Sequence, residues 1–297
     1  METTIIHVTD VHGDLDRIGE AVKKAPPYSI VAVSGDIHDW DARRAKPEEL
    51  EAHLKTLRQL AAMAKQKGCY LVVCSGNHDA WAATRPYHWL AIQEDNLLGD
   101  FSNAILNLNG VETIVTCFPW RQAEGQAQEG VIVTVRKPPL RADIEAQGRI
   151  RQMLAEGRRW QMEKARPWVW LHHNPPSKTA ASGGRDASDI LVDWIHEFHP
   201  TAVLSGHIHT APFIDGGSPL SYLGTTLVSN PGTTKATVRL NQISITQEGG
   251  AWKAAAKWST ASLISGYNPG PVQGDTGESP AIIIGQLKIP DRLKSRG

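Results

Sequence analysis

Short apolar segments alternate with segments of helical periodicity along the first part of the chain. Continuous apolar, β-branched runs cover residues 4–9, 28–34 and 70–74. Between them, apolar residues recur at helical spacing over 15–25 and 47–67. Buried strands that alternate with helices are typical of βαβ units in a parallel sheet. The pattern therefore predicts an α/β fold in which several strands end at one common edge.

The pattern changes in the middle of the chain and then returns. Residues 104–108 and 112–118 flank the turn residues Asn109 and Gly110, which predicts a β-hairpin. We expect 119–166 to form a long, mostly helical insertion, with an excess of basic residues. The elements predicted after it are a strand at 168–172, a helix at 189–198, a strand at 201–205, β-runs at 219–228 and 236–246, and a β-like stretch around Trp252.

The C-terminal part differs from the rest. Residues 266–280 are rich in Gly and Pro, which is typical of a loop or linker. Residues 281–289 are apolar enough to form one more strand that docks on the body. The chain has no internal repeat, so we expect one domain over 1–259 and a C-terminal extension over 260–297.

Composition excludes several classes of protein. The 297 residues include 31 basic and 31 acidic side chains, so the formal net charge is zero. This balance argues against a strongly basic nucleic-acid coat protein or an acidic tail protein. No stretch approaches the roughly 18 apolar residues of a membrane helix, and the first ten residues do not resemble a signal peptide. Since Cys69, Cys74 and Cys117 lie in apolar runs, we expect reduced core thiols in a cytoplasmic protein.

Five polar motifs stand directly after predicted strands. In chain order they are Asp10-Val11-His12-Gly13-Asp14, Gly35-Asp36, Gly76-Asn77-His78-Asp79, His172-His173-Asn174-Pro175-Pro176 and Gly206-His207-Ile208-His209. Because the carboxyl ends of strands in an open α/β sheet converge on one crevice, the motifs predict a single cluster of carboxylates, an asparagine and histidines.

Such a cluster requires a charge to satisfy it. Buried carboxylates and imidazoles must be paired or must bind a metal. These ligand types suit Mn, Fe, Zn, Co or Ni, and the lack of cysteine argues against a structural thiolate zinc site. The ligands outnumber the usual complement of one ion. Two ions about 3.5–4 Å apart that share one carboxylate would use them all.

Together the motifs closely resemble the signature of the calcineurin-like metallophosphoesterases, D-x-H, G-D, G-N-H-[D/E], H and G-H-x-H. All five blocks occur in this order between Asp10 and His209. The resemblance implies a metallophosphoesterase domain with an α/β fold, a four-layer αββα sandwich of two mixed β-sheets flanked by helices. It also implies a dinuclear metal-dependent phosphoester hydrolase, in which a metal-bridging hydroxide attacks phosphorus in line. The expected cofactors are two metal ions, with Mn, Fe or Zn as the candidates.

The resemblance also assigns roles to single residues. The expected ligands of the first metal are Asp10, His12, Asp36 and His209, and those of the second are Asp36 as a bridge, Asn77, His173 and His207. In the fourth block the family pattern H-x-P-P fits His173. Adjacent strand residues point to opposite faces, so His172 and His173 are not both expected to be ligands.

Two further residues of the third block have implied catalytic roles. His78 is the family's non-ligand histidine, which contacts phosphate oxygens and acts as general acid towards the leaving group. Asp79 is expected to orient the His78 ring.

Residues near the motifs have competing interpretations. Asp14 is well placed to cap the helix that begins at Leu15. Both a structural role and a substrate contact fit His38, whereas His7 and His53 are read as structural. The basic insertion is either a solvated helical face or a cap over the crevice. If it is a cap, residues near the mouth would be Trp120, Arg121 and Trp160, and Trp40, Trp81 and Trp89 could line the cleft although core packing is their default.

Several functions remain open within this family. We favour a phosphodiesterase that acts on a small or nucleotide diester. A phosphomonoesterase is the alternative, although Asp79 stands where the serine/threonine phosphatases have Glu. A nuclease ranks lower because the net charge is zero. A non-catalytic scaffold of the same fold, as in one retromer subunit, ranks last because His78 and every ligand position are filled. We expect a phosphoester small-molecule or nucleotide partner, no membrane, and an oligomeric state that the sequence leaves open.

Overall fold

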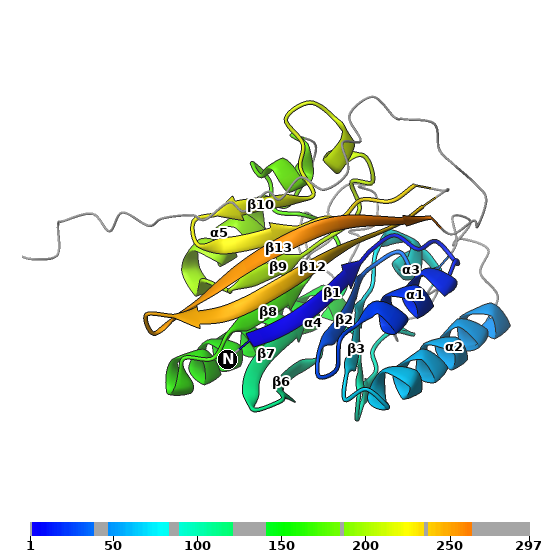
Figure 1. Cartoon of the computed structure of the whole chain (residues 1–297), viewed down its shortest axis with the longest axis horizontal. Coiled ribbons are helices and arrows are strands. Elements are labelled where there is room, and N and C mark those ends of the chain that lie inside the picture. The colour runs from blue at the N-terminus through cyan, green and yellow to red at the C-terminus, as the bar shows by residue number, and fades with distance from the viewer. Residues whose placement is uncertain are drawn as a thin grey trace, which may run out of the picture.

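Two β-sheets face each other across an apolar core. The computed structural model describes residues 2–38, 47–82, 89–120, 141–184, 187–234 and 237–262 (Figure 1). Within these residues the first sheet consists, in spatial order, of β13 (Ala251–Ser262), β12 (Thr237–Glu248), β1 (Glu2–Val8), β2 (Ile30–Ser34), β3 (Tyr70–Cys74), β5 (Leu97–Leu98) and β4 (Gln93–Glu94). The second consists of β10 (Leu220–Leu223), β11 (Thr226–Ser229), β9 (Ala202–Leu204), β8 (Trp168–Leu171), β7 (Val111–Cys117) and β6 (Asn103–Leu108).

Both sheets are mixed, with parallel strands at the centre and antiparallel strands at the edges. In the first sheet β1, β2, β3 and β5 are parallel, while β4, β12 and β13 are antiparallel to their neighbours. In the second sheet β7, β8, β9 and β11 are parallel, and β6 and β10 are antiparallel. The parallel strands bring their carboxyl ends to one edge of the molecule.

Helices cover the outer faces of both sheets. The helices α1 (Asp16–Lys24) and α2 (Pro47–Lys65) pack on the first sheet in one apolar cluster with outward-facing residues such as Ile6 and Val8. The helices α4 (Arg141–Lys164) and α5 (Asp189–Phe198) pack on the second sheet (Figure 1). Ile5, between Thr4 and Ile6 on β1, belongs to the cluster between the sheets. The predicted αββα sandwich is therefore confirmed.

Most predicted elements form close to their expected positions, and the shortest ones were not predicted. The helix α3 (Asn77–Ala82) begins inside the third motif, and β4 and β5 have two residues each. The run predicted over 219–228 divides into β10 and β11, with Gly224 between them at a φ of 61°. The C-terminal strand predicted at 281–289 lies outside the described residues, while β13 continues to Ser262.

The prediction that Asp14 caps helix α1 is wrong. Leu15 occupies the N-cap position with helical dihedral angles, φ −68° and ψ −13°, and no side chain caps the helix. The carboxylate of Asp14 instead accepts a hydrogen bond from Nε of Arg17 at 3.0 Å. The acid therefore binds an arginine side chain in the first turn rather than a backbone N–H group.

The described part of the basic insertion packs as a crossover helix. Ile150 and Leu154 of α4 are buried against Trp168 on the outer face of the second sheet. Trp160 joins the same cluster and does not line the mouth of the site. On the exposed side, Arg159 pairs with Glu163 at 3.3 Å. These contacts favour a solvated helical face, and residues 121–140, with Arg121, lie outside the described part.

A buried histidine joins the two sheets beside the motif loops. His7 is fully buried, and its ring lies 2.8 Å from Oγ of Ser34 through Nε2 and 2.7 Å from Oγ of Ser229 through Nδ1. Ser34 ends β2 and Ser229 ends β11, so the ring links one sheet to the other. Burial lowers the pKa of His7 to about 3 against the opposing effect of Asp10, so the imidazole is neutral near pH 7.

The neutral state of His7 makes the fold sensitive to acid. The folded protein binds a proton at His7 only near pH 3, whereas the unfolded chain binds one near 6.5. Below pH 6.5 the unfolded state therefore takes up more protons at this residue, and the contribution of His7 to stability falls by about 1.4 kcal/mol per pH unit. We expect His7→Gln, which cannot titrate, to lower the unfolding free energy by about 1–3 kcal/mol at pH 7.5. The difference from wild type should shrink between pH 6.5 and 5 in urea unfolding of the metal-free proteins. A difference that stays constant over this range would contradict the assignment.

Candidate metal centre

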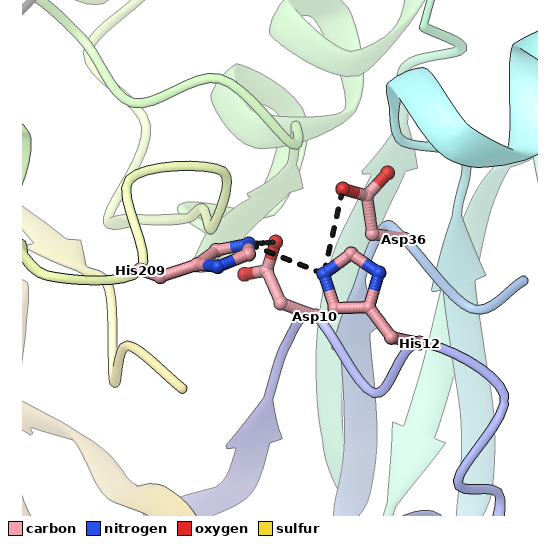
Figure 2. Close-up of side chains that lie close together, drawn as sticks. All are labelled: Asp10, His12, Asp36 and His209. Carbon is pink, nitrogen blue, oxygen red and sulfur yellow. Dashed lines mark hydrogen bonds and ion pairs between the residues drawn. The ribbon is translucent and has the colours of Figure 1, made fainter. Parts of the chain in front are cut away.

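The structure gathers all the predicted ligands at one edge, from loops of both sheets. Asp10 and His12 follow β1, and Asp36 follows β2. Asn77 begins α3 directly after the β3 loop. His173 follows β8, and His207 and His209 follow β9. Figure 2 shows the side chains of Asp10, His12, Asp36 and His209 pointing toward one another.

The first group consists of Asp10, His12, Asp36 and His209. One ligand atom from each lies within 4.8 Å of all the others. Nε2 of His209 is 3.0 Å from Oδ1 of Asp10 and 3.2 Å from Nε2 of His12. Ligand atoms placed about 2 Å from one ion lie roughly 3–4 Å apart. The donor set therefore fits a single metal ion.

The second group consists of Asn77, His173 and His207, and it shares Asp36 with the first. Oδ1 of Asn77 lies 3.2 Å from Nε2 of His173 and 2.9 Å from Nδ1 of His207. Nε2 of His173 lies 3.3 Å from Oδ2 of Asp36, and that same oxygen is 4.0 Å from Nε2 of His12. One oxygen of Asp36 thus stands between the two groups, which is the arrangement expected of a bridging carboxylate.

The two histidines of the fourth motif lie in different surroundings. Nδ1 of His173 donates to the backbone oxygen of Ser34 at 2.7 Å, which directs Nε2 toward the cluster. Nδ1 of His172 donates to the backbone oxygen of Asn174 at 2.7 Å, and its ring centroid is 6.2 Å from that of Phe118. The geometry places His173 among the predicted ligands.

The loops that carry these ligands adopt uncommon backbone conformations. Positive φ angles occur at Asp10 (53°), His12 (47°), Asp36 (50°) and His207 (65°). Residues other than glycine rarely adopt such angles, which cost of order 1–3 kcal/mol each and cluster at functional sites. Four of the seven predicted ligands therefore carry backbone strain that the surrounding structure must offset.

Glycines next to the ligands allow a close approach. A Cβ on Gly35, whose φ is 91°, would lie 2.8 Å from Cβ of His173 and overlap the imidazole. A Cβ on Gly206 would lie 2.9 Å from Cβ of Thr9 and 2.5 Å from Oδ2 of Asp10. These two motifs therefore need glycine, because the imidazole of His173 occupies the Cβ space at Gly35, and the side chains of Thr9 and Asp10 occupy it at Gly206.

The carboxylates and imidazoles shift one another's pKa values in the metal-free protein. Burial alone would raise the pKa of Asp10, but His209 and His173 lower it overall. Burial lowers the pKa of His12 and of His207 to about 4 each. For His173, burial is outweighed by Asp36 and Asp10, which raise its pKa to about 9. The buried carboxylates thus attract positive charge, and a metal ion would compete with a proton for this place.

His78 lies at the cluster, whereas Asp79 is engaged with the backbone of the loops. The ring of His78 stands edge-on to that of His12 at 4.8 Å between centroids, and its Nε2 is 3.9 Å from Oδ2 of Asp36. The carboxylate of Asp79 accepts from the backbone N–H groups of Ile37, His38 and Gly76 at 2.8–3.1 Å. Asp79 thereby joins the second motif to the third, and orientation of the His78 ring by Asp79 stays a prediction.

The described tryptophan and histidine residues near the motifs pack against the ligands or against neighbouring loops and side chains. Trp120 packs against the second group of ligands. His38 is buried, with Nδ1 3.3 Å from Nδ1 of His53, which favours its structural role. Nε1 of Trp89 donates to the backbone oxygen of Asp79 at 3.3 Å. Trp40 and the side chain of Trp81 lie outside the described part of the chain.

The sequence interpretation did not identify the residues that support the ligands. Thr9 Oγ1 donates to Oδ2 of Asp10 at 2.7 Å. Nδ2 of Asn230 donates to the backbone oxygens of Gly206 and Ile208 at 3.3 and 3.2 Å, and so holds the fifth motif. Asn230 follows β11 and precedes Pro231-Gly232, so its place after a strand end was the one available signal.

An αββα sandwich with aspartate, histidine and asparagine donors at its strand ends defines a metal-binding α/β protein. A family model described as calcineurin-like phosphoesterase matches residues 3–211. This match covers more than half of the 297 residues, so the chain belongs to the calcineurin-like phosphoesterase family.

One solved phosphoesterase structure shares the fold of the chain. The calcineurin-like phosphoesterase YfkN from Bacillus subtilis has a TM-score of 0.50 at 17% identity, with 88% of this chain and 90% of that chain covered. Vacuolar protein sorting 29 from Cryptosporidium parvum has a TM-score of 0.33 at 10% identity, with 88% and 98% covered. No curated protein sequence gives a significant match. None of the helices in the described residues has the length and apolar character needed to cross a membrane.

The contact between Gly35 and His173 gives a test of the second ligand group. We expect Gly35→Ala to displace the imidazole and weaken binding of the second metal ion by at least about 10-fold. Gly110→Ala is the matched control, because Gly110 has a similar φ of 87° but nothing within 4 Å of its Cβ position. Both variants should lose about 1 kcal/mol of stability from the backbone. Elemental analysis after dialysis against Mn²⁺ distinguishes them, and equal metal content in the two variants would refute the expected contact.

Proposed function

We propose that the protein is a dinuclear metal-dependent phosphoesterase. The observation that carries this proposal is the position of Asp36, whose Oδ2 lies between two groups of metal-binding side chains. A single metal ion would bind one of these two ligand groups and leave the other without a cation. Membership of the calcineurin-like phosphoesterase family supports phosphoester hydrolysis as the reaction.

The residues present fit two metal ions. Asp10, His12, Asp36 and His209 would hold the first, and Asn77, His173 and His207 would join Asp36 around the second. Nitrogen and oxygen ligands without sulfur fit Mn, Fe or Zn, and metal availability selects among them. When bound, two such ions supply activation of water and neutralisation of the negative charge on the phosphoryl group.

The chain's own residues would position these ions and protonate the leaving group. The backbone N–H of His78 donates to Oδ1 of Asp36 at 2.9 Å, which leaves Oδ2 directed at the two ligand groups. The same residue places its imidazole next to the cluster, 8% exposed. From there His78 contacts a phosphoryl oxygen and gives a proton to the departing alkoxide.

Within phosphoester hydrolysis, we propose a phosphodiesterase acting on a small or nucleotide diester. The third motif ends in Asp79 rather than the glutamate of serine/threonine phosphatases. The described part of the basic helix α4 packs on the second sheet, so it adds no support for a nucleic-acid clamp over the site. The three free, buried thiols support a cytoplasmic location.

Paired substrates test the reaction class. The protein is stripped of metal, restored with Mn²⁺ and assayed on bis(p-nitrophenyl) phosphate and p-nitrophenyl phosphate. We expect diester turnover well above monoester turnover. Asp36→Asn should lose metal and activity together, by more than the roughly 10–100-fold that loss of an outer-shell partner brings, while the exposed Asp193→Asn serves as control. Faster monoester turnover would make the protein a phosphatase, and inactivity on both with two metals bound would favour the scaffold alternative.

A second variant tests the general acid. We expect His78→Ala to keep two metal ions and to lose about 10²–10⁴-fold in turnover on alkyl esters. The loss should be smaller for p-nitrophenyl esters, because p-nitrophenolate leaves without protonation. His196→Ala, on the exposed side of α5, is the control. Full activity of His78→Ala on alkyl esters would show that another group supplies the proton.

A further inference from the structure

One buried tryptophan packs against two of the three side chains that complete the second ligand group. Trp120 lies three residues beyond the end of β7 and is 3% exposed. Its ring centroid is 5.3 Å from that of His173 and 5.1 Å from that of His207. Among the described residues, the aromatic rings in contact with Trp120 are these two imidazoles. Trp120 therefore packs against the second ligand group and not against the first.

The backbone of Trp120 reaches the loop of the third ligand. Its N–H donates to Oγ of Ser75 at 2.7 Å, and the N–H of Ser75 donates to Oδ1 of Asp100 at 2.8 Å. Ser75 lies two residues before Asn77. Trp120 therefore packs against His173 and His207 and is hydrogen-bonded to the loop that leads to Asn77.

The contribution of Trp120 comes from its ring and not from its indole N–H. Nε1 is buried and has no hydrogen-bond partner within the described part of the chain. The ring stands at 73° to the imidazole of His173 and at 44° to that of His207. Nδ1 of His173 is also fixed by the backbone oxygen of Ser34, whereas the ring nitrogen interaction of His207 is with the ligand Asn77. His207 therefore depends most on the tryptophan for its orientation.

We propose that Trp120 is a positioning residue for the second metal ion. Its ring packs against the imidazoles of His173 and His207 and limits their rotation, so that Nε2 of one and Nδ1 of the other converge with Oδ1 of Asn77. Residues that orient ligands affect metal affinity by about 10–100-fold. This inference rests on the proposed dinuclear function, and it assigns Trp120 to one of the two ions.

The experiment is a titration of the metal-free full chain with Co²⁺, followed by equilibrium dialysis and elemental analysis. We expect wild type to bind two equivalents. Trp120→Leu, which removes the aromatic wall, should keep one tight equivalent and bind the second about 10–100-fold more weakly. Trp120→Phe keeps an aromatic ring without the N–H, and it should bind both equivalents of Co²⁺ as tightly as wild type. Trp160→Leu, at a site in the cluster under the second sheet, is the control for loss of a tryptophan.

Indole emission gives a second readout that does not depend on the leucine variant folding. Co²⁺ quenches nearby indoles, so the second equivalent should quench a component of wild-type emission that Trp120→Phe lacks. Identical quenching in the two proteins would overturn the proposal, as would unchanged affinity in Trp120→Leu or a loss in Trp120→Phe equal to that of the leucine variant. A wild-type chain that binds a single equivalent would instead refute the dinuclear function, which keeps the two failures distinct.

Discussion

The attraction between two buried carboxylates and positive charge governs this edge of the molecule. Asp10 and Asp36 are each 1% exposed, and they follow neighbouring parallel strands. Two carboxylates in such surroundings are unfavourable unless cationic or metal partners offset their charge. In the metal-free protein that charge falls on imidazoles, most clearly on His173. The histidines, the asparagine and the motif glycines can all be understood as the means of presenting ligands around these two acids.

The fold supplies the rigidity that this arrangement demands. Left-handed backbone angles at Asp10, Asp36 and His207 are strained, and they persist because hydrogen bonds fix the loops from several sides. Asp79 binds the backbone of two motifs, and Asn230 binds the loop of the fifth. Asp79 lies in the first turn of α3, and Asn230 directly follows β11. The apolar sandwich thus serves as a frame, and the polar loops carry the strain.

The sequence predicts much of the fold and the gathering of the candidate ligands at one edge, for identifiable reasons. Strands such as Tyr70–Cys74 are continuous apolar runs, and the motifs follow them directly, so periodicity and spacing locate both. Support by Asn230, or by Trp120 against His207, depends on contacts between residues far apart in the chain, which no local pattern contains. Local reasoning also failed at Asp14, because a nearby Arg17 offered the carboxylate a stronger partner than the helix N–H groups.

The origin of the ligands in both sheets has a consequence for stability. Asp10 and Asp36 extend from one sheet, while His173 and His207 extend from the other. Metal ions held by this set would crosslink two layers that are otherwise joined by apolar packing and by hydrogen bonds such as those of His7 and of Thr3 with Thr113. By mass action, an ion that binds only the folded state stabilises it in proportion to the logarithm of its free concentration. The resistance of the whole sandwich to unfolding would then rise with the concentration of free metal ion around the protein.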